Sequence, residues 1–185
     1  MDTKEAILSA ARTAAQAHGY GGLNFRDLAA EVGIKAASLH YHFPSKADLG
    51  AAVAKRYWQD TAAELEAMRS ELPDAAERLR RYPTIFRRSL ENGNRMCLCS
   101  FMAAEYDDLP EAVKAEVQNF SNINVSWLSE TLAAAGLTDL AKIEKRARAI
   151  FAAISGAQLL ARSRADIALF DELVSSYREA GFVPG

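Results

Sequence analysis

The sequence predicts an all-α protein of about nine helices. Apolar side chains recur three and four positions apart along most of the chain, which is the period of an amphipathic helix. Glycine, proline and capping residues divide this pattern into segments, and no alternation of polar and apolar residues indicates a strand. The helices are expected at about residues 3–18, 25–32, 34–43, 45–70, 74–90, 95–106, 107–136, 139–164 and 166–180.

The first two helices have clear ends and clear faces. In the first, Ile7 and Ala11 share one side, and Gly19 provides the C-terminal stop. Asn24 can cap the second helix, with Asp27 close to the positive end of its dipole. One apolar stripe runs along the second helix: Phe25, Leu28, Ala29 and Val32.

A tight turn at Gly33 joins the second and third helices, which is the layout of a helix-turn-helix. In the third helix, Leu39 and Phe43 face inward. The opposite side carries small residues first and larger hydrogen-bonding residues one turn later: Ala37, Ser38, His40 and Tyr41. A helix that reads the major groove needs this order, because its N-terminal end comes closest to the base edges. Any compact helix pair with a glycine turn remains an alternative.

Proline and capping residues separate the later helices. Pro44 ends the third helix, and Ser45 with Asp48 resembles a capping box for a long fourth helix. Pro83 lies inside the fifth helix and should kink it. The other boundaries come from turn and capping residues at 72–74, 92–94, 107–110, 136, 139 and 166.

Composition and charge limit the classes of protein. Half of the residues are hydrophobic, which is enough for a core, and no apolar run reaches membrane-spanning length. The polar N-terminus does not resemble a signal peptide, and two cysteines give no disulfide framework, so a cytoplasmic location is expected. The net charge is −2, but residues 1–56 carry seven basic and five acidic side chains. A positive N-terminal part on an acidic remainder suits contact with phosphate at one end.

Four motifs in the first quarter of the chain carry a family resemblance: AILSAA at residues 6–11, GY at 19–20, RDLAAEVGI at 26–34 and SLHYHFPSKADL at 38–49. From about residue 3 to residue 50 the chain resembles the DNA-binding domain of TetR-family transcriptional regulators. The resemblance implies a helix-turn-helix DNA-binding domain over residues 1–46 and a ligand-binding and dimerisation domain over 47–185. It also implies a homodimeric repressor, released from a palindromic DNA operator by a small-molecule effector, with no enzymatic activity and no cofactor.

The resemblance also implies the DNA-contacting residues. They are Arg26, Lys35, Ala36, Ala37, Ser38, His40, Tyr41, His42 and Lys46. Arg26 can reach a base edge or a phosphate, or can be an ordinary surface arginine. His40 stands where the family usually has Tyr, which leaves the base preference there open. Lys46 should bind phosphate together with the free N–H groups that begin the fourth helix. His40 and His42 point to different sides of a helix, so no metal site is expected.

An effector pocket is expected among side chains of the middle helices: Tyr57, Phe86, Met96, Cys97, Phe101, Phe120, Asn124 and Trp127. Asn124 interrupts an apolar stripe and needs a partner, which is either a ligand or another side chain or water. Cys97 and Cys99 point apart on a helix, so a disulfide is not expected. Each is either a reactive sensor, if its pKa is lowered, or a buried structural thiol. The arginines between residues 78 and 88 either attract an anionic ligand or form a solvated helix face.

The last two long helices are predicted to form the dimer interface. Their apolar stripes contain Ile150, Phe151, Ile154, Ala157, Phe170, Leu173, Val174 and Tyr177. Paired across a twofold axis they would form a four-helix bundle, and the alternative is a core within one chain. An enzyme would need an acid–base pair or metal-ligand spacing that the sequence does not show. A non-specific architectural DNA-binding protein should be far more basic. A helical adaptor without DNA contact would not need Arg26, Tyr41 and Lys46.

Overall fold

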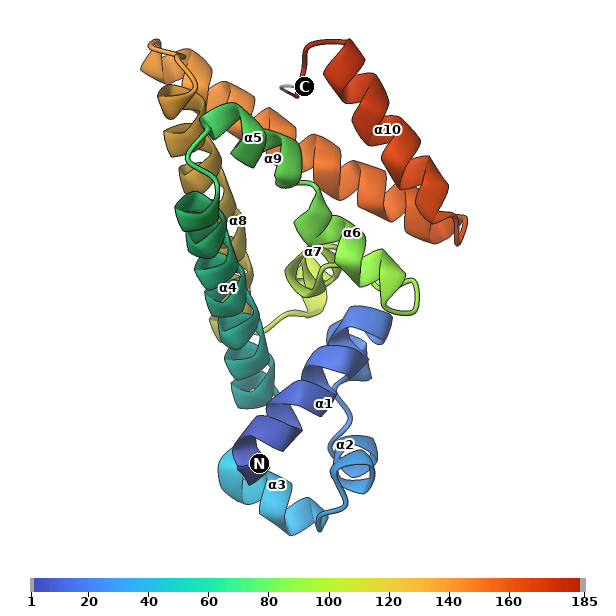
Figure 1. Cartoon of the computed structure of the whole chain (residues 1–185). Helices are drawn as coiled ribbons and strands as arrows, with labels where there is room; N and C mark the ends of the chain where they lie inside the picture. Colours follow the sequence, from blue (N-terminus) through green and yellow to red (C-terminus); the bar gives the residue numbers. More distant parts are fainter. Residues whose placement is uncertain (1, 184–185) are drawn as a thin grey trace. The chain divides into compact units, whose positions relative to one another are not determined.

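The structure is a computed structural model that describes residues 2–183, and every regular element in that range is helical (Figure 1). The predicted all-α class is therefore confirmed. The chain divides into two compact units. The first unit comprises Met1–Asp60 and Cys97–Phe120, and the second comprises Thr61–Met96 and Ser121–Gly185. Two long helices, α4 (Lys46–Glu71) and α8 (Glu111–Ala134), contribute residues to both units.

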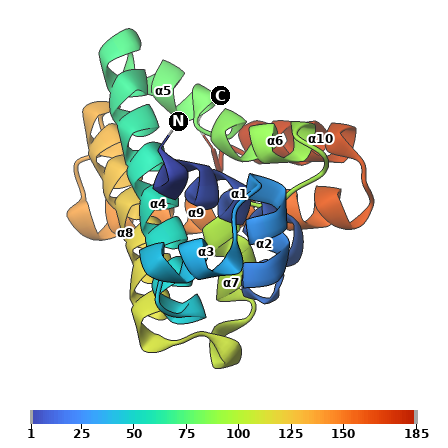
Figure 2. The same ribbon diagram turned by 90° about the horizontal axis from the view of Figure 1, so that it is seen from below.

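The first unit consists of short helices around the N-terminal part of α4. They are α1 (Thr3–His18), η1 (Tyr20–Gly22), α2 (Phe25–Val32), α3 (Ala36–His42), α7 (Leu98–Ala103) and η2 (Tyr106–Asp108). Helix α1 packs against α2, η1 and α7, and α2 packs against α3 (Figure 2). The apolar stripes predicted for these helices supply the core, which includes Ile7, Ala11, Leu28, Ala29, Leu39 and Phe43.

Two predicted helix caps are confirmed in this unit. Asn24 Oδ1 accepts hydrogen bonds from the backbone N–H groups of Arg26 (2.9 Å) and Asp27 (3.3 Å). Ser45 Oγ accepts from the Asp48 N–H at 3.1 Å, while Asp48 Oδ2 accepts from the Ser45 N–H at 3.0 Å. These side-chain oxygens satisfy N–H groups that the first turn of a helix leaves without backbone partners. The caps therefore fix where α2 and α4 begin.

The second unit contains α5 (Ala75–Arg81), α6 (Thr84–Glu91), α9 (Leu140–Ser163) and α10 (Ile167–Glu179). Helices α9 and α10 run antiparallel to each other, and both pack against α6 (Figure 1). The kink predicted at Pro83 is a break: α5 ends at Arg81 and α6 begins at Thr84. Proline lacks the N–H that would continue the helical hydrogen bonds, so the segment expected as one helix becomes two.

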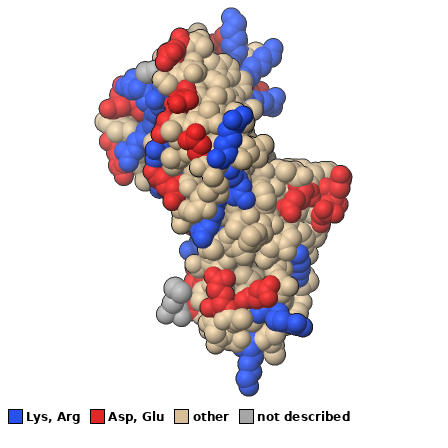
Figure 3. Space-filling view, turned by 90° about the vertical axis from the view of Figure 1, so that its right-hand side faces the viewer, with Lys and Arg blue, Asp and Glu red and all other residues tan. Residues whose placement is uncertain are grey.

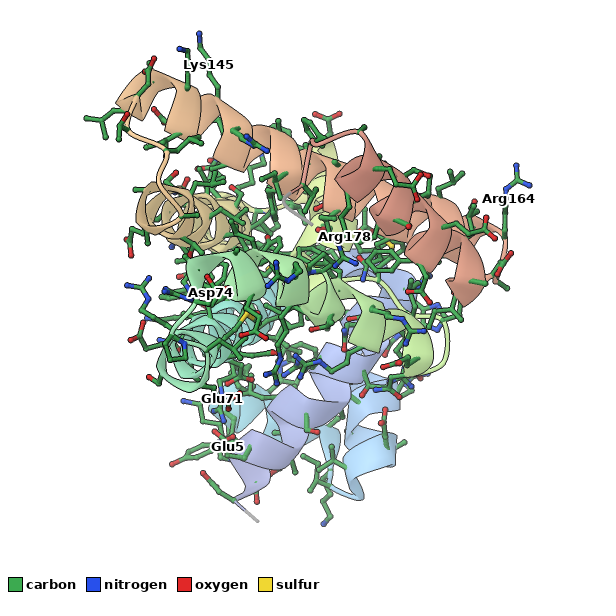
Figure 4. All side chains as sticks on the ribbon, turned by 45° about the horizontal axis from the view of Figure 1, so that its top comes forward. Glu5, Glu71, Asp74, Lys145, Arg164 and Arg178 are labelled. Carbon is green, nitrogen blue, oxygen red and sulfur yellow. The ribbon has the colours of Figure 1, made fainter. Side chains whose placement is uncertain are left out.

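Side chains at the ends of the second unit differ in their exposure (Figure 4). Lys145 and Arg164, towards the two ends of α9, are exposed and point away from the ribbon. Arg178 of α10 is half-buried, and one of its terminal nitrogens donates to the backbone carbonyl of Arg80 in α5 at 2.6 Å. This hydrogen bond joins α10 to α5.

Tyr82 is the centre of an aromatic cluster in the core of the second unit. Its side chain is completely buried, stacks on Trp127 with ring centroids 5.7 Å apart, and meets Phe86 at the same distance edge to face. The Tyr82 hydroxyl donates to Asn124 Oδ1 at 2.8 Å, and Trp127 Nε1 donates to the carbonyl of Leu65 at 3.0 Å. The buried amide of Asn124 thus has a protein partner, and each polar atom in these bonds is held within an apolar surrounding.

We predict that Tyr82→Phe lowers the free energy of unfolding by about 1 kcal/mol, because it removes one buried hydrogen bond and keeps the ring contacts. Urea unfolding followed by circular dichroism measures the change. Tyr106→Phe is the matched control, since Tyr106 is 54% exposed and the loss of its hydroxyl removes no buried hydrogen bond. Equal stability of the two variants would contradict a stabilising role for the Tyr82 hydroxyl.

Candidate nucleic-acid interface

The turn at Gly33 sets the geometry of α2 and α3. Gly33 has φ 74° and ψ 32°, a left-handed conformation that costs other residues roughly 1–2 kcal/mol. The N–H of Ile34 donates to the carbonyl of Ala29 at 2.9 Å, and the N–H of Gly33 donates to that of Ala30 at 3.2 Å. These bonds close α2, and the chain enters α3 three residues after the glycine. The turn therefore has the form expected for a helix-turn-helix.

The two sides of α3 differ sharply in burial. Leu39 is fully buried and Phe43 nearly so, whereas Tyr41 is 84% exposed. Of the nine residues predicted to contact DNA, six are exposed: Arg26, Lys35, Ala36, Ala37, His40 and Tyr41. The other three are half-buried: Ser38, His42 and Lys46. The structure thus gathers small, hydrogen-bonding and cationic groups on the outward side of α2 and α3, where they can reach a ligand that lies across the surface.

His40 is exposed, but its ring contacts another side chain. Its imidazole lies 4.7 Å from the ring of Phe25, centroid to centroid, at an interplanar angle of 47°. The place of Phe25 on the inner stripe of α2 did not predict its contact with His40, because this contact depends on the angle between two helices. A ring held in this way loses less rotational freedom when it binds a partner. By contrast, the Tyr41 ring contacts only the edge of His42 among the aromatic contacts described, at 5.3 Å.

Lys46 provides a cationic group at the start of α4. The Nζ of Lys46 is 4.6 Å from the centroid of the Tyr20 ring, a cation–π contact. Lys46 is the first residue of a 26-residue helix whose N-terminal N–H groups carry partial positive charge. A lysine and a helix N-terminus together form a favourable place for a phosphate. Tyr20 was not predicted to have a role, because nothing in its sequence surroundings indicates the contact with Lys46.

The residues predicted for an effector pocket lie in the interiors of both units. Four of them belong to the first unit: Tyr57, Cys97, Phe101 and Phe120. The ring centroids of Tyr57 and Phe120 are 5.6 Å apart. The second unit contains Phe86, Met96, Asn124 and Trp127. All eight are buried except Phe101, which is half-buried.

The thiols of Cys97 and Cys99 are free and buried. Burial raises the pKa of the Cys97 thiol, against the opposing effect of hydrogen bonds from Ser100 and Tyr57, and raises that of Cys99 further. A raised pKa keeps a thiol protonated and unreactive near neutral pH. The lowered pKa that a reactive sensor requires is therefore not found in this structure, and both cysteines fit the structural alternative.

The arginines between residues 78 and 88 are engaged with carboxylates and a carbonyl of the second unit. A surface groove of about 560 Å³ between α4 and the α5–α6 segment is crossed by the pairs Arg81–Glu71 and Arg88–Glu64. Arg87 forms two 2.8 Å hydrogen bonds with Asp171 and lowers the pKa of that carboxyl. The pairing of these arginines with carboxylates agrees with the solvated-face interpretation. Basic and acidic side chains also lie next to each other on parts of the face in Figure 3.

Most of the residues predicted for a dimer interface form the core of the second unit. Five are buried: Ile150, Ile154, Ala157, Phe170 and Val174. The other three are half-buried: Phe151, Leu173 and Tyr177. The prediction followed the strongest apolar stripe, and in the structure α9 and α10 turn this stripe towards α6. In the C-terminal half of α9 a different stripe is exposed, and it consists of small residues and leucines: Ala152, Gly156, Leu159, Leu160 and Ser163.

The described residues were also compared with the requirements of a metal site and of a membrane-spanning helix. Within residues 2–183, no three or more His, Cys, Asp or Glu side chains are grouped so that they could hold a metal ion. None of the helices in that range is both long and apolar enough to cross a lipid bilayer.

Comparisons with known proteins agree with this geometry. Residues 7–53 match the model of the bacterial regulatory proteins of the tetR family. The structure is similar to that of a TetR transcriptional regulator from Legionella pneumophila, with 30% identity, 97% of each chain covered and a TM-score of 0.91. It is also similar to a TetR-family regulator from Agrobacterium tumefaciens, with 29% identity, 99% of this chain and 98% of the other covered, and a TM-score of 0.88. None of the curated proteins matches the chain.

We predict that Gly33→Ala lowers the free energy of unfolding by about 1–2 kcal/mol, because alanine is strained in the left-handed conformation. A Cβ at this position would meet no atom within 4 Å, so the effect comes from the backbone and not from crowding. Gly21→Ala is the control, because Gly21 does not have a left-handed φ and a Cβ there would have its nearest contact at 3.9 Å. Thermal or urea unfolding of both variants tests the prediction, which fails if Gly33→Ala is as stable as Gly21→Ala.

Proposed function

The chain belongs to the TetR family of bacterial transcriptional regulators, and on this premise we propose that it is a homodimeric repressor released from a palindromic operator by a small-molecule effector. Regulators of this family bind DNA and small-molecule ligands as dimers and are generally not enzymes. The observation that carries the proposal is the outward face of α3, where Tyr41 is 84% exposed beside the ordered ring of His40. The DNA-binding part corresponds to residues 1–46, and residues 47–185 supply effector binding and dimerisation.

The residues of the proposed DNA surface divide into those that contact bases and those that contact the backbone or the groove wall. Arg26 donates to a guanine edge, an interaction that discriminates against other bases by roughly 1–3 kcal/mol, or to the flanking phosphate. Ala36 and Ala37 allow the start of α3 to approach the bases closely and contact thymine methyl groups. His40, held against Phe25, hydrogen-bonds a base edge. The remaining groups lie along the sugar–phosphate backbone or the groove wall and fix the register on which the base contacts depend: Lys35, Ser38, Tyr41, His42 and Lys46.

A single helix-turn-helix reads only a half-site, so two copies are needed for a palindrome. We assign the dimer contact to the exposed stripe of α9, together with the adjoining side of α10. Leu159 and Leu160 are 56% and 43% exposed, and Gly156 allows a partner helix to come close. Two such helices from each protomer would make a four-helix bundle across the twofold axis. The recognition helices of the pair should then lie about one turn of DNA apart, ~34–36 Å.

The effector would act through α4. This helix is continuous over 26 residues, begins with Lys46 in the first unit and continues into the second. We expect the effector to bind in the second unit among Phe86, Met96, Asn124 and Trp127, where Asn124 can exchange its bond with Tyr82 for one to the ligand. A shift of α4 would change the separation of the two recognition helices. Typical coupling free energies of about 1–3 kcal/mol weaken DNA binding 5–150-fold.

We predict that Tyr41→Ala abolishes specific operator binding and leaves dimerisation intact, because the side chain contacts nothing in the protein core. The probe is a DNA duplex that the wild-type protein selects from a random-sequence library, measured by fluorescence anisotropy. Tyr106→Ala, a second exposed tyrosine of the first unit, is the control and should bind like wild type. Unchanged affinity of Tyr41→Ala would remove this residue from the DNA surface.

The assignment of the dimer contact is tested by Leu160→Glu, which places a charge in the exposed stripe of α9. We predict that this variant is a folded monomer in sedimentation equilibrium at concentrations where the wild type is a dimer. The control is Leu140→Glu, since Leu140 is 80% exposed but lies on a different side of α9. A Leu160→Glu protein that stays dimeric would show that α9 does not meet the partner through this stripe.

A further inference from the structure

Glu105, just after α7, holds the backbone of η1 with both carboxylate oxygens. Oε2 accepts a hydrogen bond from the Tyr20 N–H at 2.6 Å, and Oε1 accepts from the Gly21 N–H at 3.5 Å. Tyr20 and Gly21 precede Glu105 by 85 and 84 positions, so these hydrogen bonds join two segments of the first unit that are distant in the sequence. A carboxylate that binds backbone N–H groups forms charge-assisted hydrogen bonds, which are stronger than neutral ones.

The carboxylate leaves no space at the neighbouring position. A Cβ on Gly19 would lie 2.2 Å from Glu105 Oε2, and its three nearest atoms all belong to that carboxylate. Gly19 also has φ 66°, which favours glycine. Glycine at position 19 therefore does two things: it leaves space for the Glu105 carboxylate, and it allows the positive φ with which the chain leaves α1. This complementarity shows that the position of Glu105 is closely determined.

The side chain of Tyr20 continues the link to α4. Its ring lies so close to Gly50 that a Cβ there would meet Tyr20 Cε2 at 2.7 Å. Desolvation raises the pKa of the Tyr20 hydroxyl, in agreement with a ring that packs against the protein. The face of the same ring is 4.6 Å from the Nζ of Lys46, one helical turn before Gly50. The backbone of Tyr20 is thus fixed by Glu105, while its ring fixes the lysine.

We propose that Glu105 is a positioning residue for DNA binding, which holds Lys46 in place for a phosphate through the backbone and ring of Tyr20. The inference rests on the proposed function, because it takes Lys46 as a phosphate contact. A displacement of Glu105 releases the Tyr20 ring, and Lys46 then exchanges an ordered orientation for a mobile one.

The dependence of DNA affinity on salt distinguishes this role from a purely structural one. Each phosphate contact adds about 0.9 to the slope of log K against log salt concentration, so loss of Lys46 from both protomers should reduce the slope by roughly 2. We predict that Glu105→Ala and Lys46→Ala reduce the slope by similar amounts and weaken binding at least threefold. The double variant should show no further reduction. The probe is again the duplex that the wild-type protein selects from a random-sequence library.

Three further variants complete the test. Tyr20→Leu removes the ring face and should reduce the slope as Glu105→Ala does, while Tyr20→Phe keeps the face and should behave like wild type. These two variants decide the question even if Glu105→Ala fails to fold. Glu111→Ala is the matched control, since Glu111 is an acidic residue of the same unit that pairs with Lys114 and is 89% exposed. Its slope should not change.

The outcomes separate the inference from the function on which it rests. If Glu105→Ala and Tyr20→Leu lower only the melting temperature and keep the wild-type slope, while Lys46→Ala reduces it, the inference is wrong and the proposed function stands. The inference is also wrong if Lys46→Ala leaves the slope unchanged. A wild-type protein that selects no sequence from the library would overturn the proposed function, and the inference with it.

Discussion

The backbone conformation at Gly33 determines how the first unit presents its surface. Because Gly33 has a left-handed backbone conformation, α2 ends there, and α3 packs against α2 at an angle that buries Leu39 and Phe43. The remaining side of α3 has no core to join, and its side chains face outward. The same angle brings Phe25 and His40 together, so that one glycine both exposes the recognition surface and orders part of it. A dihedral angle at one residue thus connects the fold of this unit with its proposed function.

The second unit is held together in a different way, by polar groups fixed inside an aromatic cluster. Tyr82 stacks on Trp127, bonds to Asn124 and follows directly from α5, so it joins the broken helix at Pro83 to α8. Buried polar groups of this kind specify one arrangement, because any displacement costs a hydrogen bond. An effector that entered this region would have to replace those bonds with its own. The cluster therefore gives a physical basis for the proposed coupling of effector binding to helix position.

Much of this structure is predictable from the sequence, since local patterns determine it. Such patterns involve residues within a few positions of one another. Examples are the caps formed by Asn24 and by Ser45 with Asp48, and the apolar stripes of α1 to α3. What the sequence did not reveal depends on packing between distant segments. The Glu105–Tyr20 bond and the Phe25–His40 contact carry no local signature, and Tyr82 gave no sign of being the partner of Asn124. The stripe of α9 that contains Ile154 was predicted to form a dimer interface, with a core within one chain as the alternative, and it is buried within the chain. Periodicity shows that a side of a helix is apolar and not what covers it.

The proposed function requires the outward side of α3 to bind DNA as half of a symmetric pair. This can be tested by titrating the ¹⁵N-labelled protein with its selected duplex and recording TROSY NMR spectra. We expect the amide signals of α3, of Arg26 and of the start of α4 to shift together and to saturate at one duplex per two protomers. Shifts confined to another surface, or saturation at one duplex per protomer with no change in α3, would contradict it.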